Sequence, residues 1–227
     1  IDSYSYTYDA SHNQISKTDA KGTTSYSYDS LNRLQKVTEP SGKVIRYLFD
    51  KAGNRIHETA IAGTSSISTA YTYNEQNRLM TTTTRSSGTT EKVTYEYDNN
   101  GNTLIKVKET TKPVEEGTTS SFRFYKLGTI EEKEVTFYEY DIWNQLIKTT
   151  EGDKEISYQY NGEGYRVEKQ VNDNITRYMY EADKVVLELD GQGNETARNI
   201  YGANLLMRTS GAEEYYYMYN GHGDVTA

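Results

Sequence analysis

The sequence predicts an all-β protein, a continuous antiparallel β-hairpin meander that curls into a spiral sheet. An aromatic pair of the form Tyr-x-Tyr recurs at intervals of 20 to 24 residues, with one longer interval of 43 between Tyr95 and Tyr138. The chain contains 23 Tyr and only 2 Pro, a composition that favours strands. Asp or Asn follows almost every pair, and these residues begin turns because their short side chains bond back to the backbone.

Each copy of the repeat predicts one hairpin. Both rings of a pair lie on one face of a strand, because side chains alternate between faces. Gly or Asn then supplies the left-handed position of the turn, and a basic residue with an apolar neighbour begins the return strand. The residues with these repeat-structural roles are Tyr6, Tyr8, Asp9, Tyr26, Tyr28, Asp29, Arg33, Tyr47, Phe49, Asp50, Gly53, Arg55, Tyr71, Tyr73, Arg78, Tyr95, Tyr97, Asp98, Tyr138, Tyr140, Asp141, Tyr158, Tyr160, Arg166, Tyr178 and Tyr180.

The hairpins form one array over residues 1–227. Roughly twenty strands are expected, more than the about ten that an open twisted sheet usually holds, so the sheet should curl with one hand. A solenoid with a closed core is the alternative. From the second aromatic to the first Arg, Gln or Thr of the return strand, the spacing alternates between six and five residues, which predicts long and short turns in succession. The alternation stays in phase across the long interval, so residues 109–134 are predicted to be an insertion within one repeat, an extended hairpin or flap, and not a further repeat.

Composition limits the function classes. With no Cys, the chain has neither disulfides nor thiolate metal sites. A net charge of −8 argues against nucleic acid and anionic membranes as partners. No apolar run has the length of a membrane span. Because the sequence begins without Met, we expect it to be a fragment of a larger protein.

No residue pattern predicts an active site or a cofactor. Residues 98–109 carry Asp98, Asn100, Asn102 and Glu109 in the order of a calcium loop, but the loop's Gly is replaced, and a hairpin turn is favoured. The three His residues are far apart in sequence, without metal-ligand spacing. No Ser lies in a nucleophile elbow. The chain is therefore predicted not to be an enzyme, with no catalytic or metal residue and no cofactor.

The segments YTYDASHNQI, YSYDSLNRLQKVTEPSGK, YLFDKAGNRI and YEYDNNGNTL resemble the YD repeat of the Rhs (rearrangement hot spot) family. The resemblance covers residues 4–227. The family includes bacterial wall-associated polymorphic toxins, the C component of insecticidal toxin complexes, and teneurins. It implies a β-sheet shell that encloses a C-terminal effector, in a secreted protein or one at the bacterial cell surface or cell wall. The implied partners are adjacent repeats, the core region of the same parent chain and the enclosed effector polypeptide.

Two functions remain for the tyrosines. In the first, they stack between hairpins and the chain is a non-enzymatic scaffold, which is the favoured reading because all copies share the position. In the second, they form a carbohydrate- or cell-surface-binding module with a glycan as partner. Trp143 lies at a turn tip, where it either contacts a ligand or packs locally.

Overall fold

The computed structural model describes residues 3–113, 129–220 and 222–226, and within these ranges every regular element is a β-strand. The predicted antiparallel meander is confirmed. The strands are β1 Ser5–Tyr8, β2 Gln14–Asp19, β3 Gly22–Tyr28, β4 Leu34–Thr38, β5 Val44–Phe49, β6 Arg55–Ala62, β7 Ser65–Tyr73, β8 Leu79–Ser86, β9 Thr89–Tyr97, β10 Thr103–Pro113, β11 Thr129–Tyr140, β12 Leu146–Glu151, β13 Lys154–Tyr160, β14 Arg166–Val171, β15 Asn174–Glu181, β16 Lys184–Asp190, β17 Glu195–Tyr201, β18 Leu205–Ser210 and β19 Glu213–Tyr216.

The ladders from β1 to β9 and from β11 to β19 each join strands that are consecutive in the chain, and all are antiparallel. β10 pairs with β9 and β11. This connectivity follows from the short turns, because antiparallel neighbours need only a few residues between them.

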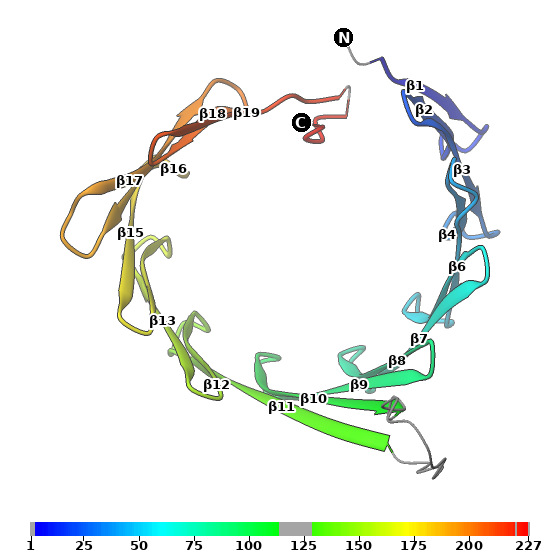
Figure 1. Cartoon of the computed structure of the whole chain (residues 1–227), viewed down its shortest axis with the longest axis horizontal. Helices are drawn as coiled ribbons and strands as arrows, with labels where there is room; N and C mark the ends of the chain where they lie inside the picture. The colour runs from blue at the N-terminus through cyan, green and yellow to red at the C-terminus, as the bar shows by residue number, and fades with distance from the viewer. Residues whose placement is uncertain (1–2, 114–128, 221, 227) are drawn as a thin grey trace, which may run out of the picture. The chain divides into compact units, whose positions relative to one another are not determined.

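The chain divides into two compact units. The first unit comprises Ile1–Glu96 and Lys106–Val135, and the second comprises Tyr97–Ile105 and Thr136–Ala227. Within the first unit, β1 to β9 follow one another along a curve, and within the second unit β12 to β19 do the same (Figure 1). Curvature of one sense is expected from the fixed hand of sheet twist.

Each unit lacks a conventional core. Among the described residues, the buried hydrophobic side chains are Val93 and Ala197, and the buried polar residue is Asn199. The other described residues divide about equally between half-buried and exposed, and the half-buried side chains pack against neighbours on their own face of the sheet. Cross-strand pairs of side chains therefore supply the packing that a second layer supplies elsewhere. None of the described segments forms a helix with the length and hydropathy of a membrane span.

The expected alternation of long and short turns is wrong. The second aromatic pairs with the residue six positions later in copies of both kinds, as in Tyr8 with Gln14 and Tyr28 with Leu34. The ladders that begin at Phe49, Tyr73, Tyr140 and Tyr160 have the same spacing. Arg33 is therefore the last residue of a turn, whereas Arg55 is the first residue of a strand. The spacing of six and five residues in the sequence therefore reflects which residue type occupies the last turn position, and the number of residues in the turn does not change.

The strands on either side of the predicted insertion are long. β10 has 11 residues and β11 has 12. Acidic side chains of this pair meet lysines: Lys112 Nζ lies 2.8 Å from Glu132 Oε2, and Lys108 Nζ lies 3.2 Å from Glu91 Oε2 of β9. Residues 114–128, in the middle of the predicted insertion 109–134, lie outside the described residues.

Candidate functional site: the Tyr-Asp turns and the tyrosine face

The five-residue turn that follows seven of the aromatic pairs has one hydrogen-bonding scheme, which Asp29 illustrates. The backbone N–H of Asp29 donates to the carbonyl of Arg33 (2.9 Å), and the N–H of Asn32 donates to the carbonyl of Asp29 (3.0 Å). Asp29 Oδ1 also accepts from the backbone N–H groups of Leu31 (2.9 Å) and Arg33 (3.0 Å). Asn32 has φ 58°, a left-handed conformation that Asn and Gly tolerate best. The same backbone scheme recurs in turns 9–13, 50–54, 74–78, 98–102, 141–145 and 161–165, and we call all seven the Tyr-Asp turns.

Hydrogen bonds lower the pKa values of five turn carboxylates. The backbone N–H of Arg33 is the main cause that lowers the pKa of Asp29 below its ordinary value of 3.8. The side-chain amide of Asn54 has the same effect on the pKa of Asp50. Side-chain amides likewise lower the pKa values of Asp9, Asp98 and Asp190. The carboxylates serve as fixed acceptors for backbone N–H groups, a role that needs no proton transfer.

The second tyrosine of a pair bonds to the preceding hairpin. The hydroxyl of Tyr28 donates to the backbone carbonyl of Gln14 (2.8 Å), which is the residue that pairs with Tyr8 in the previous copy. Tyr73 donates in the same way to the carbonyl of Arg55 (2.9 Å). Further bonds of this kind run from Tyr160 to Leu146, from Tyr180 to Arg166 and from Tyr219 to Leu205. Each bond ties consecutive hairpins together, at a net contribution of about 1 kcal/mol.

Arginines cover the rings on this side of the sheet, which we call the tyrosine face. The guanidinium of Arg166 lies 4.4 Å from the ring centre of Tyr158, and that of Arg33 lies 4.8 Å from the ring centre of Phe49. Arg55 approaches the rings of two consecutive copies, Tyr47 and Tyr71. Cation–π contacts at exposed sites contribute about 0.5–1 kcal/mol each. Arg33, Arg55 and Arg166 thus each contact an aromatic ring on a neighbouring strand.

Neighbouring Tyr-Asp turns are linked by side chains in pairs. Asn13 Nδ2 donates to Asn32 Oδ1 (2.9 Å), and Asn54 Nδ2 donates to Asn77 Oδ1 (2.8 Å). Asn102 and Asn144 form the corresponding link in the second unit (2.8 Å). In the first pair, the fifth turn residue is Asn in the donor turn and Arg in the acceptor turn. This difference produces the alternation in the sequence, because Asn at the fifth position displaces the basic residue by one.

The link between successive pairs uses the arginine. Arg33 Nε donates to Asp29 Oδ2 (2.7 Å), and its Nη1 donates to the backbone carbonyl of Asp50 in the following turn (2.9 Å). In the first unit, hydrogen bonds from the side chains of Asn13 and Arg33 therefore link the turns 9–13, 29–33 and 50–54 in succession.

The structure places all of the predicted repeat residues on this edge or on the tyrosine face. Of the paired aromatics, only Tyr8 is exposed (48%), and the others are half-buried: Tyr6, Tyr26, Tyr28, Tyr47, Phe49, Tyr71, Tyr73, Tyr95, Tyr97, Tyr138, Tyr140, Tyr158, Tyr160, Tyr178 and Tyr180. Burial is the main cause that raises the pKa values of Tyr28, Tyr47, Tyr71, Tyr73, Tyr140 and Tyr178. Gly53 has φ 94° at the fourth turn position, and Asp98 and Asp141 begin their turns.

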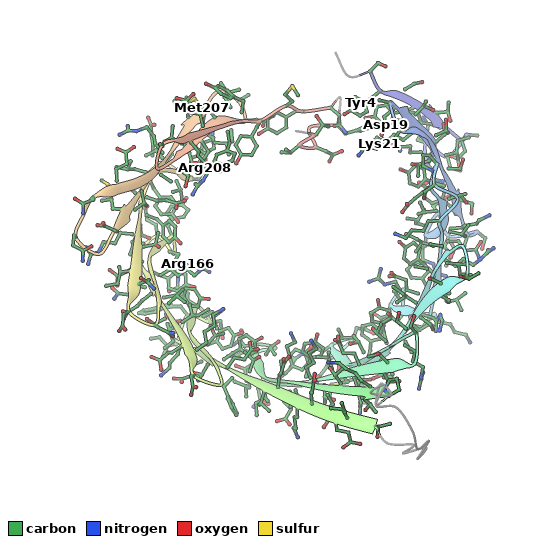
Figure 2. All side chains as sticks on the ribbon, viewed as in Figure 1. Tyr4, Asp19, Lys21, Arg166, Met207 and Arg208 are labelled. Carbon is green, nitrogen blue, oxygen red and sulfur yellow. The ribbon has the colours of Figure 1, made fainter. Side chains whose placement is uncertain are left out.

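A charged network in the second unit was not predicted from the sequence. Arg208 donates through Nη1 and Nη2 to the two carboxylate oxygens of Glu188 (2.8 and 3.0 Å), and Nη1 also donates to Asn199 Oδ1 (3.0 Å). Asn199 in turn donates to the carbonyl of Val185 (2.8 Å). Figure 2 shows Arg208 on the concave side of this unit's curve and Met207 on the other side, as alternation along a strand requires. Asn199 stands two residues before Tyr201, where other copies of the repeat have the first tyrosine of the pair. In this copy the polar network therefore takes the place of that tyrosine.

A groove lies between the Tyr-Asp turns 141–145 and 161–165. It has a volume of about 640 Å³ and is lined by Trp143, Tyr158, Tyr160, Gln145 and Glu163, among others. The side chain of Trp143 is 74% exposed at the turn tip. Gln145 stands here where the corresponding turns of the first unit have arginine. A groove with an exposed aromatic ring and several amide and carboxylate groups has the chemistry to bind a small polar ligand.

Within residues 3–113, 129–220 and 222–226, no three His, Asp or Glu side chains gather in a way that would hold a metal ion. The calcium-like stretch at residues 98–109 consists of the Tyr-Asp turn 98–102 and the first part of β10, and in the turn Asn102 Nδ2 donates to Asp98 Oδ2 (2.8 Å). The carboxylate of Asp98 is thus engaged in the turn.

Comparison with known proteins agrees with this geometry. The teneurin YD-shell family model matches residues 52–226, and the RHS repeat model matches residues 8–44 and 28–65. The tRNA3(Ser)-specific nuclease WapA of Bacillus spizizenii and the tRNA nuclease WapA of Bacillus subtilis are each 31% identical over 207 residues, or 88% of this chain. The chain spans about 7% of the length of these curated relatives.

Solved structures show the same fold. The TcdB2-TccC3-TEV crystal structure superposes with a TM-score of 0.52, and TcdB2-TccC3 without its hypervariable C-terminal region superposes with 0.51. Both are 12% identical to this chain, and each match covers 98% of this chain and 14% of the other. The family model covers most of the chain, and the repeated turn, tyrosine and ladder geometry accounts for the match. The chain belongs to the teneurin YD-shell family.

Proposed function

We propose that this chain is a non-enzymatic wall segment of a YD-repeat shell, and that the shell encloses a C-terminal effector of the same parent protein. The observation that carries the proposal is the coupling of consecutive hairpins. Backbone ladders, tyrosine hydroxyls and turn-to-turn amides join each hairpin to the next without a second layer or a core. A sheet built in this way extends along the chain as a wall.

Three further observations support enclosure. The chain belongs to a family named for its shell, and Arg166, whose guanidinium lies over the ring of Tyr158, is on the concave side of the second unit (Figure 2). The relatives that share 31% identity are named as nucleases, and the chain spans only about 7% of them. One similar structure was determined without a hypervariable C-terminal region. An effector that follows the repeat array in the parent of this chain would account for the nuclease names of the relatives and for the separate C-terminal region of the similar structure. The repeat array itself would have no catalytic role.

The partners and location follow from this role. The segment would pair with adjacent repeats and the core region of its parent, and the parent would be secreted or held at the bacterial cell surface or cell wall. Residues 1–227 would form one array, in which residues 109–134 are an insertion that lengthens a single hairpin. The lengths of β10 and β11 support the insertion.

Limited proteolysis of the full parent protein tests enclosure. The C-terminal segment should resist protease while the shell is intact. Tyr160→Phe with Tyr180→Phe removes two hydroxyl links between hairpins, and should allow cleavage of the C-terminal segment at a lower protease concentration. Gln159→Ala, on the opposite face of the same strand, is the control and should not change cleavage. Cleavage of the segment in the unaltered parent as fast as in the isolated effector would contradict the proposal.

A second candidate function is glycan binding at the groove beside Trp143. The half-buried, hydroxyl-bonded repeat tyrosines do not form an exposed platform, so the groove is where the structure favours this function. Trp143→Ala should abolish retention on immobilised glycans that bind the unaltered chain. Leu31→Ala is the matched control, because Leu31 occupies the same turn position and is 67% exposed. Absence of retention of the unaltered chain on a broad glycan array would exclude this function.

A further inference from the structure

The first unit separates charge between the two faces of its sheet. Register partners in adjacent strands point to the same face, so the ladders assign each side chain to a face. One row across β3 to β9 consists of Ser27, Lys36, Arg46, Thr59, Ser68, Arg85 and Thr90. The adjacent row across β5 to β9 consists of Leu48, His57, Ala70, Thr83 and Lys92. We call these two rows the basic face, and neither row contains an acidic residue.

Two of the acids on the same strands, Glu58 and Glu91, lie on the opposite face, and the third, Glu96, lies on the same face as the two basic rows but outside them, near the end of β9. Tyr47 pairs with Glu58, and Glu91 lies in the same row on β9. Glu58 binds Arg55 (2.9 Å) and Glu91 binds Lys108 (3.2 Å), so the acids of that face are neutralised by its own cations. The chain is acidic overall, with a net charge of −8, and this makes two adjacent rows without a carboxylate a distinct local feature.

The cations of the basic face are available for a partner. Among the described residues, Lys36, Arg46, Arg85 and Lys92 form no ion pair with an acid of the chain. Arg46, Arg85 and Lys92 are exposed, and Lys36 is half-buried. The hydroxyl and imidazole groups between them are also ordered, since His57 lies within hydrogen-bonding distance of Ser68 (3.2 Å) and Thr59 (3.3 Å).

The spacing of the rows suits a linear polymer with regular charges. Neighbouring strands lie about 4.8 Å apart, so Lys36 and Arg46 are one strand step apart, and Arg46 and Arg85 are three steps, about 14 Å, apart. Hydroxyl groups occupy the steps between them. A polysaccharide presents hydroxyl groups and charges at repeats of comparable length, and both would find partners along one row.

The basic face has no aromatic side chains on which the bases of a nucleic acid could stack. Neither row contains Phe, Tyr or Trp, whereas proteins that bind single-stranded nucleic acid stack its bases on aromatic side chains. The chemistry of the face is charge together with hydroxyl groups. We propose that the basic face of the first unit binds a linear anionic polysaccharide. This inference is independent of enclosure, because it concerns the face of the first unit opposite the tyrosines.

Binding of the whole 227-residue chain to polygalacturonate tests the proposal, with neutral dextran and oligo(dT) as comparison probes. Affinity electrophoresis should show retardation by polygalacturonate and none by dextran. Arg46→Gln with Arg85→Gln should weaken polygalacturonate binding by about tenfold, since each exposed charge contributes up to about 1 kcal/mol. Arg46→Lys with Arg85→Lys should retain most of the binding, and higher salt should weaken it.

Lys51→Gln with Lys154→Gln is the control of equal charge change, because both lysines are exposed and lie outside the basic face. It should alter binding less than twofold, about the effect of a distant screened charge. Thermal melting of every variant checks folding. Equal weakening by both pairs of substitutions, no retardation of the unaltered chain, or tighter binding of oligo(dT) than of polygalacturonate would each overturn the proposal.

Discussion

At the scale of single residues, a hydroxyl group distinguishes most second aromatics from Phe49. Tyr28, Tyr73, Tyr160 and Tyr180 each donate to a backbone carbonyl of the preceding hairpin. Phe49 occupies the equivalent position with a ring alone, under the guanidinium of Arg33. The ring and the hydroxyl therefore make separate contributions, and the hydroxyl bond can be removed without disturbing the ring.

Tyr28→Phe should lower the free energy of unfolding by about 1 kcal/mol, the net contribution of one hydrogen bond. Urea denaturation followed by circular dichroism measures the change. Tyr26→Phe is the control: its ring lies on the same face, and among the described residues its hydroxyl donates no bond to the preceding hairpin. The assigned role of the hydroxyl would be wrong if both substitutions had equal effects.

Asp50→Asn should flatten the dependence of stability on pH in acid. The fold lowers the pKa of Asp50, chiefly through the side chain of Asn54, below the ordinary value of 3.8. The carboxylate thus contributes stability that is fully present above about pH 4 and is lost as the pH falls through the lower folded pKa. Asn at this position keeps the acceptor oxygen and has no charge to lose, as in the natural turn of Asn74.

Urea midpoints at pH 7, 4 and 3 measure this effect. The decline from pH 4 to pH 3 should be smaller in Asp50→Asn than in the unaltered chain. Asn74→Asp is the reciprocal change and should make the decline steeper. An unchanged decline in both variants would contradict the role of the turn carboxylates.

At the scale of elements, the pairing of turns through asparagine makes two hairpins the repeating unit. Asn77 combines two tasks, a left-handed backbone with φ 58° and an acceptor for Asn54 Nδ2. Asn77→Gly keeps the first task and loses the second, and should cost about 1 kcal/mol. Asn77→Ala loses both and should cost about 1–2 kcal/mol more, since a residue with Cβ is strained there.

Denaturation of both variants, alone and combined with Asn54→Ala, measures the coupling between the turns. Asn77→Gly should have a smaller effect when Asn54 is already replaced, because the shared bond is then absent. Strict additivity of the two substitutions would show that the turns are not coupled.

The hairpins could be predicted from the sequence because their signals are local. Tyr-x-Tyr sets the face, and Asp29 and Gly53 set the turn within five residues. The turn lengths were predicted wrongly because Arg33 and Arg55 look equivalent in sequence, although one ends a turn and the other begins a strand. The alternation of residue types in the sequence indicates a period of two hairpins. Only the strand register shows whether an arginine belongs to a turn or to a strand.

Contacts between distant copies could not be predicted in this way. The bond between Arg208 and Glu188 joins residues 20 apart whose strands are separated by β17. It depends on the registers of two ladders and on the bulge near Leu189. Trp143 was recognised as a turn tip, but the groove beside it depends on the spacing of two neighbouring turns.

At the scale of the whole molecule, the absence of a shared core makes stability local. The buried hydrophobic residues among those described are Val93 in the first unit and Ala197 in the second, and the resolved ladders connect each strand to its neighbours in sequence. In such an array, stability is close to a sum of repeat terms and nearest-neighbour terms. Opening can therefore occur in one group of hairpins without the rest.

Val93→Ala tests this local stability. Removing two methyl groups from a buried site should cost about 1–2 kcal/mol. Because the neighbours of Val93 in its ladder lie on β8, hydrogen exchange should accelerate in β8 and β9 and remain unchanged in β15 to β18. A chain that unfolded as one cooperative body would lose protection equally in both sets of strands, and global unfolding would then be the only route for exchange. Unequal loss, measured by mass spectrometry on peptides from the two sets, is expected because the ladder that contains Val93 joins β9 to β8, whereas β15 to β18 belong to other ladders.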